Sequence, residues 1–272
     1  MKKPLLITGV SSGIGLAMAR KFLAKGYRVF GSVRSQEKAD ELQADLGESF
    51  TPLVFDICKQ DELKNAEEIL QQALGDQPLV ALINNAGSAE IGPLLHVPLD
   101  DFRQQLDTLV VGQLGVIQRF YSYLIPKSGA DKVGRIINIS SVSGVHANPF
   151  FGCYAAGKHA LEGLSKTLRH ELQGLGIRVV VVAPANIATS IWPKQTRELI
   201  DKYKDTTYYR SLEQALEHID RSVVKHAMSV DEFADALYEI FVMAEPADRY
   251  TLAKSKSRRN PFSGERVRLV EG

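Results

Sequence analysis

Short apolar runs alternate along the chain with longer segments in which apolar positions recur every three or four residues. Short runs are typical of strands, and the longer spacing is typical of helices with one buried face. We expect strands at 5–8, 28–33, 51–55, 79–83, 135–139, 177–182 and 249–252, and helices at 13–25, 36–46, 60–74, 100–125, 154–175 and 231–244. This alternation predicts the α/β class: a doubly wound parallel sheet of about seven strands with helices on both faces.

The predicted elements form a single domain over residues 1–253, because no repeat, low-complexity tract or linker separates them. Residues 193–227 are charged and aromatic and have a weaker helical pattern. The polar segment 254–272 is expected to be a tail that is loosely ordered or packs on a partner subunit.

Composition narrows the class of protein. The 272 residues include 33 basic and 32 acidic ones, a net charge of +1, so the strongly basic footprint of a nucleic-acid-binding protein is missing. The two cysteines, Cys58 and Cys153, argue against a disulfide framework and fit a reducing compartment. No apolar run approaches the roughly 18 residues of a membrane span, and the one after the basic N-terminus is too short for a signal peptide. We therefore expect a cytoplasmic protein with a small-molecule substrate and no nucleic-acid, membrane or metal partner.

A glycine-rich turn, T-G-V-S-S-G-I-G, occupies residues 8–15 between the first strand and the first helix. Gly9 and Gly13 permit a tight turn, and Gly15 permits close packing of the helix on the sheet. The helix N-terminus offers free N–H groups and a positive dipole end to phosphates. The turn predicts a dinucleotide site, although its spacing is G-x-x-x-G-x-G. The alternative is a glycine-rich turn without a ligand.

Tyr154 and Lys158 lie four residues apart on a predicted helix, so their side chains share a face. A nearby ammonium group lowers the pKa of a tyrosine, which can then exchange a proton with a carbonyl or alcohol oxygen. A tyrosine four residues before a lysine occurs twice more in the chain, once with a proline between the two residues and once starting in a predicted strand. Only the pair of Tyr154 and Lys158 follows a strand that ends near a hydroxyl side chain, Ser141. The alternative is that Ser141 satisfies a strand end and Lys158 is a solvated helix residue.

Together these motifs resemble the classical short-chain dehydrogenase/reductase superfamily, and most closely its retinol- and steroid-dehydrogenase-like branch. The resemblance covers about residues 4–192 and rests on the glycine turn, N-N-A-G at 84–87, N-I-S-S at 138–141, Y-A-A-G-K at 154–158 and the proline turn 184–189.

The resemblance implies a Rossmann fold and assigns roles to the residues. Ser141 would hold the substrate oxygen, Tyr154 would transfer the proton, and Lys158 would also bind the nicotinamide ribose. Asp56 resembles the residue that meets the adenine, and Ile187 the one that binds the carboxamide. The predicted cofactor contacts are Gly9, Ser11, Ser12, Gly13, Ile14, Gly15, Arg34, Asp56, Asn85, Ala86, Gly87, Tyr154, Lys158, Ile187 and Thr189.

The end of the second strand predicts which nicotinamide cofactor is used. Val33 stands where an acidic residue would accept the ribose hydroxyls of NAD(H), and Arg34 follows it. The arginine offers a planar fork to the 2′-phosphate of NADP(H). We therefore predict NADP(H), with NAD(H) as the weaker candidate. The alternative is that Arg34 is an exposed loop residue paired with Glu37.

The chain departs from the family at two positions. In many members, an asparagine of the long central helix holds a water molecule that takes part in proton relay. Leu109 occupies that position in this chain. A leucine cannot hold a water, so one alternative is a catalytically weak or inactive dinucleotide-binding relative with a regulatory or structural role. Ala185 replaces a usual glycine, which requires a negative φ.

The substrate side is less defined. In the family, the loop after Thr189 covers the substrate, here about residues 190–227, and it contains Ile191, Trp192, Leu199, Tyr203, Tyr208, Tyr209 and Leu212. Such a loop favours a lipophilic carbonyl compound, or it only packs on the domain; Phe150, Phe151, Cys153 and His146 are further candidates for the pocket. We expect an NADP(H)-dependent oxidoreductase that acts on a carbonyl or secondary alcohol. By resemblance it is a homodimer or homotetramer.

Overall fold

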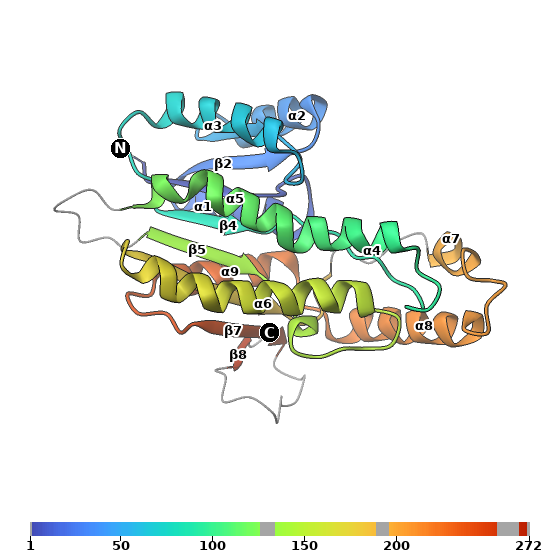
Figure 1. Ribbon diagram of the computed structural model, residues 1–272. Coiled ribbons are helices and arrows are strands. Elements are labelled where there is room, and N and C mark those ends of the chain that lie inside the picture. Colours follow the sequence, from blue (N-terminus) through green and yellow to red (C-terminus); the bar gives the residue numbers. More distant parts are fainter. Residues whose placement is uncertain (1, 126–133, 189–195, 255–266, 271–272) are drawn as a thin grey trace.

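The computed structural model describes residues 2–125, 134–188, 196–254 and 267–270, and only the backbone of 196–197, 199, 219–226 and 267–270. Its centre is one parallel sheet with the strand order β3-β2-β1-β4-β5-β6-β7-β8 (Figure 1). The strands are β1 (Pro4–Ile7), β2 (Arg28–Val33), β3 (Phe50–Val54), β4 (Ala81–Asn84), β5 (Gly134–Ile139), β6 (Ile177–Pro184), β7 (Arg249–Lys254) and β8 (Val267–Val270). The order reverses between β1 and β4, where sheets of this kind bind ligands.

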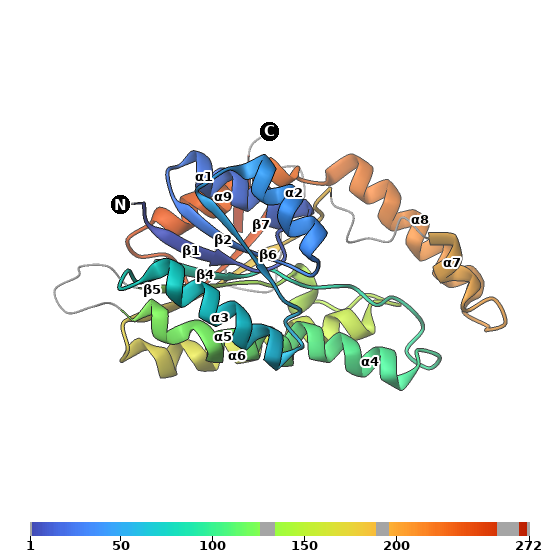
Figure 2. The same cartoon turned by 90° about the horizontal axis from the view of Figure 1, so that it is seen from above.

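Helices cover both faces of the sheet (Figure 2). α1, α2 and α9 pack on one face, and α3, α5 and α6 on the other. Their bounds are α1 (Gly13–Ala24), α2 (Gln36–Leu46), α3 (Gln60–Leu74), α4 (Leu99–Leu106), α5 (Gly112–Phe120), α6 (Gly152–Gln173), α7 (Thr196–Asp201), α8 (Tyr209–His226) and α9 (Val230–Val242). The alternating layers and the doubly wound parallel sheet confirm the predicted fold class. None of the helices in the described residues is long and apolar enough to cross a membrane.

The apolar strands account for the two cores. In β6, Val179, Val180, Val181 and Val182 are all buried, because alternate side chains enter the helix layers on opposite faces. Leu5 and Ile7 face α1 and α9, whereas Leu6 faces the opposite layer. A continuous β-branched run therefore marks a strand that is covered on both sides.

The predicted helix 100–125 is divided. α4 passes into a π-helical turn, η1 (Asp107–Val111), before α5, and the segment ends in a 3₁₀ turn, η2 (Tyr121–Leu124). A π-turn adds a residue to the helix and shifts the side chains that follow it around the axis. Leu109 lies inside this turn.

The sheet has one strand more than the expected seven. β8 lies in the segment expected to be a tail, and it pairs with β7 in parallel from Thr251↔Val267 to Lys254↔Val270. The run V-R-L-V is short and follows a charged segment, so the pattern of apolar residues did not predict an edge strand there.

Helices α7 and α8 form an arm, residues 196–226, that extends beyond the sheet beside α4 (Figures 1 and 2). A separate apolar cluster attaches the arm to the domain. It consists of Ile91, Val97, Phe151, Cys153, Ile200, Tyr203, Leu212 and Leu216. The arm is therefore anchored by its own core and not by the main sheet.

Candidate active site

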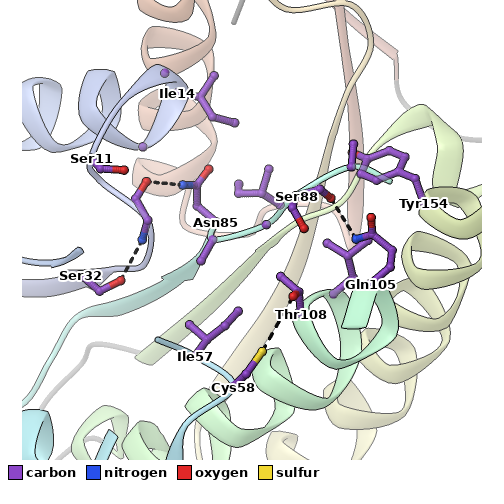
Figure 3. Close-up of a pocket in the computed structure, with 18 of the residues that line it drawn as sticks. Ser11, Ile14, Ser32, Ile57, Cys58, Asn85, Ser88, Gln105, Thr108 and Tyr154 are labelled. Carbon is purple, nitrogen blue, oxygen red and sulfur yellow. Dashed lines mark hydrogen bonds between the residues drawn. The ribbon is translucent and has the colours of Figure 1, made fainter. Parts of the chain in front are cut away.

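A pocket of about 840 Å³ runs along the carboxyl edge of the sheet. It joins the glycine turn, the ends of β2, β5 and β6, the loop after β4 and the start of α6, as Figure 3 shows in part. The predicted site residues in the described part of the chain all line it: Gly9, Ser11, Ser12, Gly13, Ile14, Gly15, Arg34, Asp56, Asn85, Ala86, Gly87, Ser141, Tyr154, Lys158 and Ile187. Thr189 lies outside the described residues.

The glycine turn requires its glycines. Gly9 has a φ of +71° and Gly13 a φ of +57°, both in the left-handed region. A Cβ on Gly9 would lie 2.8 Å from Ala86 Cα, and a Cβ on Gly15 would overlap the carbonyl oxygen of Gly9. The turn thus lies directly against the loop after β4, with its backbone at the pocket wall.

Hydrogen bonds fix this turn against the neighbouring strands. The Gly9 amide donates to Ser32 Oγ at 2.9 Å, and Asn85 Nδ2 donates to the Gly9 carbonyl at 3.0 Å (Figure 3). Thr8 Oγ1 accepts from the amides of Asn85 and Ala86 at 2.9 and 3.0 Å. Thr8 and Ser32 were not among the predicted site residues; a hydroxyl inside an otherwise apolar strand, as at Ser32, was the available signal.

The N-terminus of α1 faces the pocket without a cap of its own. Ser12 occupies the N-cap position in an extended conformation, and its side chain makes no capping hydrogen bond. Arg34 is exposed at the rim, and within the described residues it forms no ion pair, including none with Glu37. Free helix amides and an unpaired guanidinium group form a surface suited to anionic groups.

Ser141, Tyr154 and Lys158 come together at the other end of this groove. Ser141 follows β5 and caps the turn η3 (Val142–Gly144), with its Oγ accepting from the Ser143 amide at 3.1 Å. The Ser141 and Tyr154 side chains are hydrogen-bonded. Lys158 Nζ lies 5.6 Å from the centre of the Tyr154 ring and donates to the Ile139 carbonyl at 2.8 Å.

Burial controls the ionisation of this group. It raises the pKa of Tyr154 to about 12, against a smaller lowering by the hydrogen bond with Ser141. It lowers the pKa of Lys158 to about 8, which Glu162 partly offsets. The expectation that Lys158 lowers the tyrosine pKa is wrong for this arrangement, because the ammonium group turns to Ile139 and desolvation dominates. Tyr154 is therefore a protonated donor at neutral pH.

Leu109, at the position of the family's asparagine, packs against Gly157 and Gly87. It is fully buried and lines the pocket. Its Cδ1 lies 2.8 Å from the position of a Cβ on Gly157, and its Cδ2 lies 3.2 Å from one on Gly87. Only a glycine at 157 leaves room for this leucine.

The turn after β6 gives Ala185 the negative φ that an alanine at this position requires. Phe150 is the one non-glycine residue with a positive φ in the described part of the chain, so φ at Ala185 is negative. The Ala185 amide donates to the Leu252 carbonyl at 2.8 Å. An alanine therefore replaces the usual glycine without strain.

Most of the aromatic residues expected near the substrate serve to attach the arm. Tyr203 and Leu212 are buried in its cluster with Phe151 and Cys153. Tyr208 makes ring contacts with His96 and Phe150. Neither the described residues of the arm nor Phe150, Phe151, Cys153 and His146 line the pocket. Ile191 and Trp192 lie outside the described residues, and for Leu199 only the backbone is described.

The pocket extends further than the motifs indicated, into a polar recess between residues 88–90 and α4. Its lining includes Glu90, Asp101, Gln104, Gln105, Asp107 and Thr108. Gln105 Nε2 donates to the Ser88 carbonyl at 3.0 Å (Figure 3). In the sequence these residues resemble a solvated helix face, and no motif marks them. In the described residues no group of three or more histidine, cysteine, aspartate or glutamate side chains is placed to hold a metal ion.

Comparisons with known proteins agree with this geometry. The short chain dehydrogenase family model matches residues 3–199. The chain is 38% identical over 254 residues to an NADPH-dependent 3-dehydrocapnine reductase of Ornithobacterium rhinotracheale, covering 92% of this chain and 88% of that one. It is 33% identical over 255 residues to a 3-amino-tetrahydro-pyrrolizinone reductase of Xenorhabdus hominickii, covering 92% and 86%.

A solved structure of a variant of the actinorhodin polyketide ketoreductase with NADPH superposes with a TM-score of 0.76 at 26% identity. The match covers 92% of this chain and 95% of that one. The family match spans the glycine turn and the residues from Ser141 to Lys158 that meet in the pocket. The branch within the superfamily stays a prediction. The chain belongs to the short-chain dehydrogenase/reductase family of oxidoreductases.

Proposed function

We propose that this protein is an NADP(H)-dependent oxidoreductase that transfers a hydride between the nicotinamide and a carbonyl or secondary alcohol carbon of a lipophilic small molecule. One observation carries the proposal: a single pocket contains both the uncapped glycine turn and the Ser141, Tyr154 and Lys158 side chains. Binding and proton transfer can therefore act on one substrate.

The residues present fit a dinucleotide. Gly9 and Gly15 leave no room for side chains, so a phosphate can approach the backbone where α1 begins. Ser11, Ser12 and the helix amides would hold the pyrophosphate, Asp56 would meet the adenine, and Lys158 would meet the nicotinamide ribose. When bound, the cofactor supplies the hydride chemistry.

The preference for NADP(H) rests on Arg34. No carboxylate stands at Val33, and the free guanidinium group is suited to a 2′-phosphate. A 3-dehydrocapnine reductase named as NADPH-dependent, 38% identical to this chain, supports the same choice.

The catalytic residues would act on the substrate oxygen. Ser141 would donate a hydrogen bond to it, and Tyr154 would give it a proton in reduction or take one in oxidation. Lys158, on the same face of α6 and bonded to the Ile139 carbonyl, would position the nicotinamide ribose beside Tyr154.

Exposed leucines around the start of α4 favour a lipophilic substrate. Leu94 and Leu95 precede α4, Leu99 begins it, and the three are 57%, 81% and 69% exposed. A Cβ on Gly152, two residues before Tyr154, would collide with Leu94. The family resemblance further favours a homodimer or homotetramer through α5 and α6, which light scattering of the purified protein would test.

The test is a fluorescence titration with NADPH and NADH, followed by a screen of ketones and secondary alcohols. Micromolar binding of NADPH, much weaker binding of NADH and turnover that requires Tyr154 are the expected results. Failure to bind either cofactor would overturn the proposal.

A further inference from the structure

Three polar side chains follow one another along α6 at intervals of four residues: Tyr154, Lys158 and Glu162. Side chains at this spacing share a face of a helix, so the Glu162 carboxylate lies one turn beyond the Lys158 ammonium group. Tyr154 and Lys158 line the pocket, whereas Glu162 does not. A carboxylate is thus placed behind the lysine, outside the space that a cofactor or substrate can enter.

An arginine holds Glu162 between α6 and β7, which lie side by side in Figure 1. Arg249 Nε donates to both carboxylate oxygens, at 3.1 Å to Oε1 and 3.0 Å to Oε2, and Arg249 Nη1 donates to Thr251 Oγ1 at 2.8 Å. The side chains of Arg249 and Glu162 are 11% and 15% exposed, and Lys158 is 5% exposed. Charges that are shielded from water in this way interact more strongly than charges at the surface.

Glu162 and Lys158 both contact the segment that carries Ser141. Lys158 Nζ donates to the Ile139 carbonyl at 2.8 Å, at the end of β5. A Cβ on Gly144 would lie 2.9 Å from Glu162 Cγ and 3.0 Å from Glu162 Oε1, so a glycine is needed where η3 packs on this side chain. The ammonium group and the carboxylate therefore lie against the two ends of the same short segment.

Glu162 is the charged side chain that acts on Lys158. Burial lowers the pKa of the lysine to about 8, and the carboxylate opposes this effect. Other titratable side chains lie on α6 and on the elements around it, but within the described residues none of them changes this pKa by its charge. They are Asp100, Asp101 and Arg103 of α4, Asp107 of η1, Arg135 of β5, Arg178 of β6, and Cys153, Tyr154, His159, Lys166, Arg169, His170 and Glu171 of α6. Arg249 of β7 shares the carboxylate, and its positive charge offsets part of the effect of Glu162 on Lys158.

We propose that Glu162 is a positioning residue for the cofactor: held by Arg249, it keeps Lys158 in its ammonium form at the nicotinamide ribose and so extends cofactor binding to alkaline pH. This inference rests on the proposed function, in which Lys158 meets that ribose. A dinucleotide carries several negative charges, and an ammonium group attracts it more strongly than a neutral amine does. The balance between Glu162 and Arg249 then determines the pH above which affinity is lost.

The test measures the dissociation constant of NADPH by fluorescence titration from pH 6 to pH 10. In the wild type, affinity should be nearly constant below about pH 8 and fall above it. Glu162→Gln removes the charge but keeps the shape, and it should move this midpoint down by about one pH unit. Its affinity relative to the wild type should therefore be about threefold or more lower at pH 8.5 than at pH 6. Arg249→Gln leaves the carboxylate to Lys158 alone and should move the midpoint up by about half a unit.

These opposite shifts separate an electrostatic role from a structural one. Glu67→Gln is the matched control, because Glu67 forms a partly buried ion pair with Arg119 at 3.0 Å outside the pocket, and the midpoint should stay unchanged. Midpoints of Glu162→Gln and Arg249→Gln that equal the wild-type value, or that move in the same direction, would overturn the inference and leave the proposed function in place. No binding of NADPH by the wild type at any pH would overturn the proposed function and the inference with it.

Unfolding gives a second readout that needs no cofactor, and it decides the question if Arg249→Gln does not fold. When a lysine has a lower pKa in the folded protein than in the unfolded chain, the free energy of unfolding rises with pH from the lower value upward. The rise should begin near pH 8 in the wild type and in Glu67→Gln, and about one unit lower in Glu162→Gln. The same onset in Glu162→Gln as in the wild type would contradict the inference.

Discussion

The two ends of the pocket are built differently. At the cofactor end, backbone groups and glycines of one short segment form the wall, and Thr8, Ser32 and Asn85 hold it with hydrogen bonds of 2.9 to 3.0 Å. At the substrate end, side chains converge from the loop after β4 and from α4. The first end depends on local backbone geometry, and the second on tertiary packing.

This difference determines how each end tolerates change. A backbone cradle cannot be altered without altering the turn itself, because a Cβ on Gly15 would collide with the Gly9 carbonyl. A recess of side chains such as Glu90 and Asp101 can change charge or size while the fold persists. Substrate choice is thus the more variable property of such a pocket, and cofactor binding the more constant one.

The largest expected effect lies where the two ends meet. Tyr154→Phe removes the hydroxyl that exchanges the proton, and kcat should fall by roughly 10²–10⁴-fold, with NADPH affinity within about threefold of the wild type. Steady-state rates and fluorescence titration measure the two quantities. Tyr123→Phe is the matched control, because that hydroxyl bonds Glu67 at 3.3 Å outside the pocket. Equal loss of NADPH binding and rate in Tyr154→Phe would show that the two ends do not act separately.

Burial of Lys158 should make the free energy of unfolding depend on pH. Its pKa is about 8 in the folded protein against an ordinary 10.5, so the unfolded chain binds more protons between these values. The free energy of unfolding should therefore rise with pH from about 8 to about 10.5, by an amount on the order of 3 kcal/mol. Tyr154 acts in the opposite sense between about 10 and 12, since its pKa is raised.

Urea unfolding of the wild type and Lys158→Met at several pH values measures this effect. The difference in unfolding free energy between the two proteins should shift in favour of the wild type as pH increases above 8. Parallel curves from pH 7 to pH 10 would mean that the ammonium group is not desolvated in the folded protein.

The sequence predicted best the features that depend on local geometry. The helix 36–46, the helix 60–74 and the strand 28–33 have the predicted bounds, because their apolar periods coincide with capping or glycine signals. The glycine turn and the Ser141, Tyr154 and Lys158 side chains meet in one pocket, as the motifs and the family resemblance led us to expect, while their binding and catalytic roles stay predictions.

The features that the sequence did not predict depend on tertiary packing. The π-turn at Leu109 changes the helix register without a change in the apolar pattern. Tyr203 and Leu212 are apolar and aromatic whether they line a pocket or anchor an arm, and only the structure assigns them to the arm's cluster. Desolvation reverses the expected pKa of Tyr154, and burial cannot be read from a four-residue spacing.

A charge reversal at the cofactor end should change cofactor choice and leave the substrate end unaffected. Arg34→Asp removes a charged hydrogen-bond donor worth roughly 1.5–3 kcal/mol and adds repulsion, so NADPH affinity should fall by about tenfold or more and NADH affinity should hold or rise. Lys166→Asp, an equal charge change on the exposed side of α6, is the control. An unchanged ratio of NADPH to NADH affinity in Arg34→Asp would show that another group meets the 2′-phosphate.

The smallest effect concerns the contact between Leu109 and Gly157 beside Lys158. Gly157→Ala places a methyl group 2.8 Å from Leu109 Cδ1 in the native geometry, and such overpacking costs typically 1–3 kcal/mol. Leu109→Ala creates the space that this methyl group needs. The double variant should therefore be more stable than the two single changes predict, by about 1 kcal/mol, in a thermodynamic cycle measured by urea unfolding. Gly163→Ala, with no atom within 4 Å of its Cβ on the same helix, is the control, and it should stabilise α6 by up to about 1 kcal/mol alone and show no coupling to Leu109→Ala. Additive effects of Gly157→Ala and Leu109→Ala would mean that α6 and η1 move apart to admit the methyl group at little energetic cost.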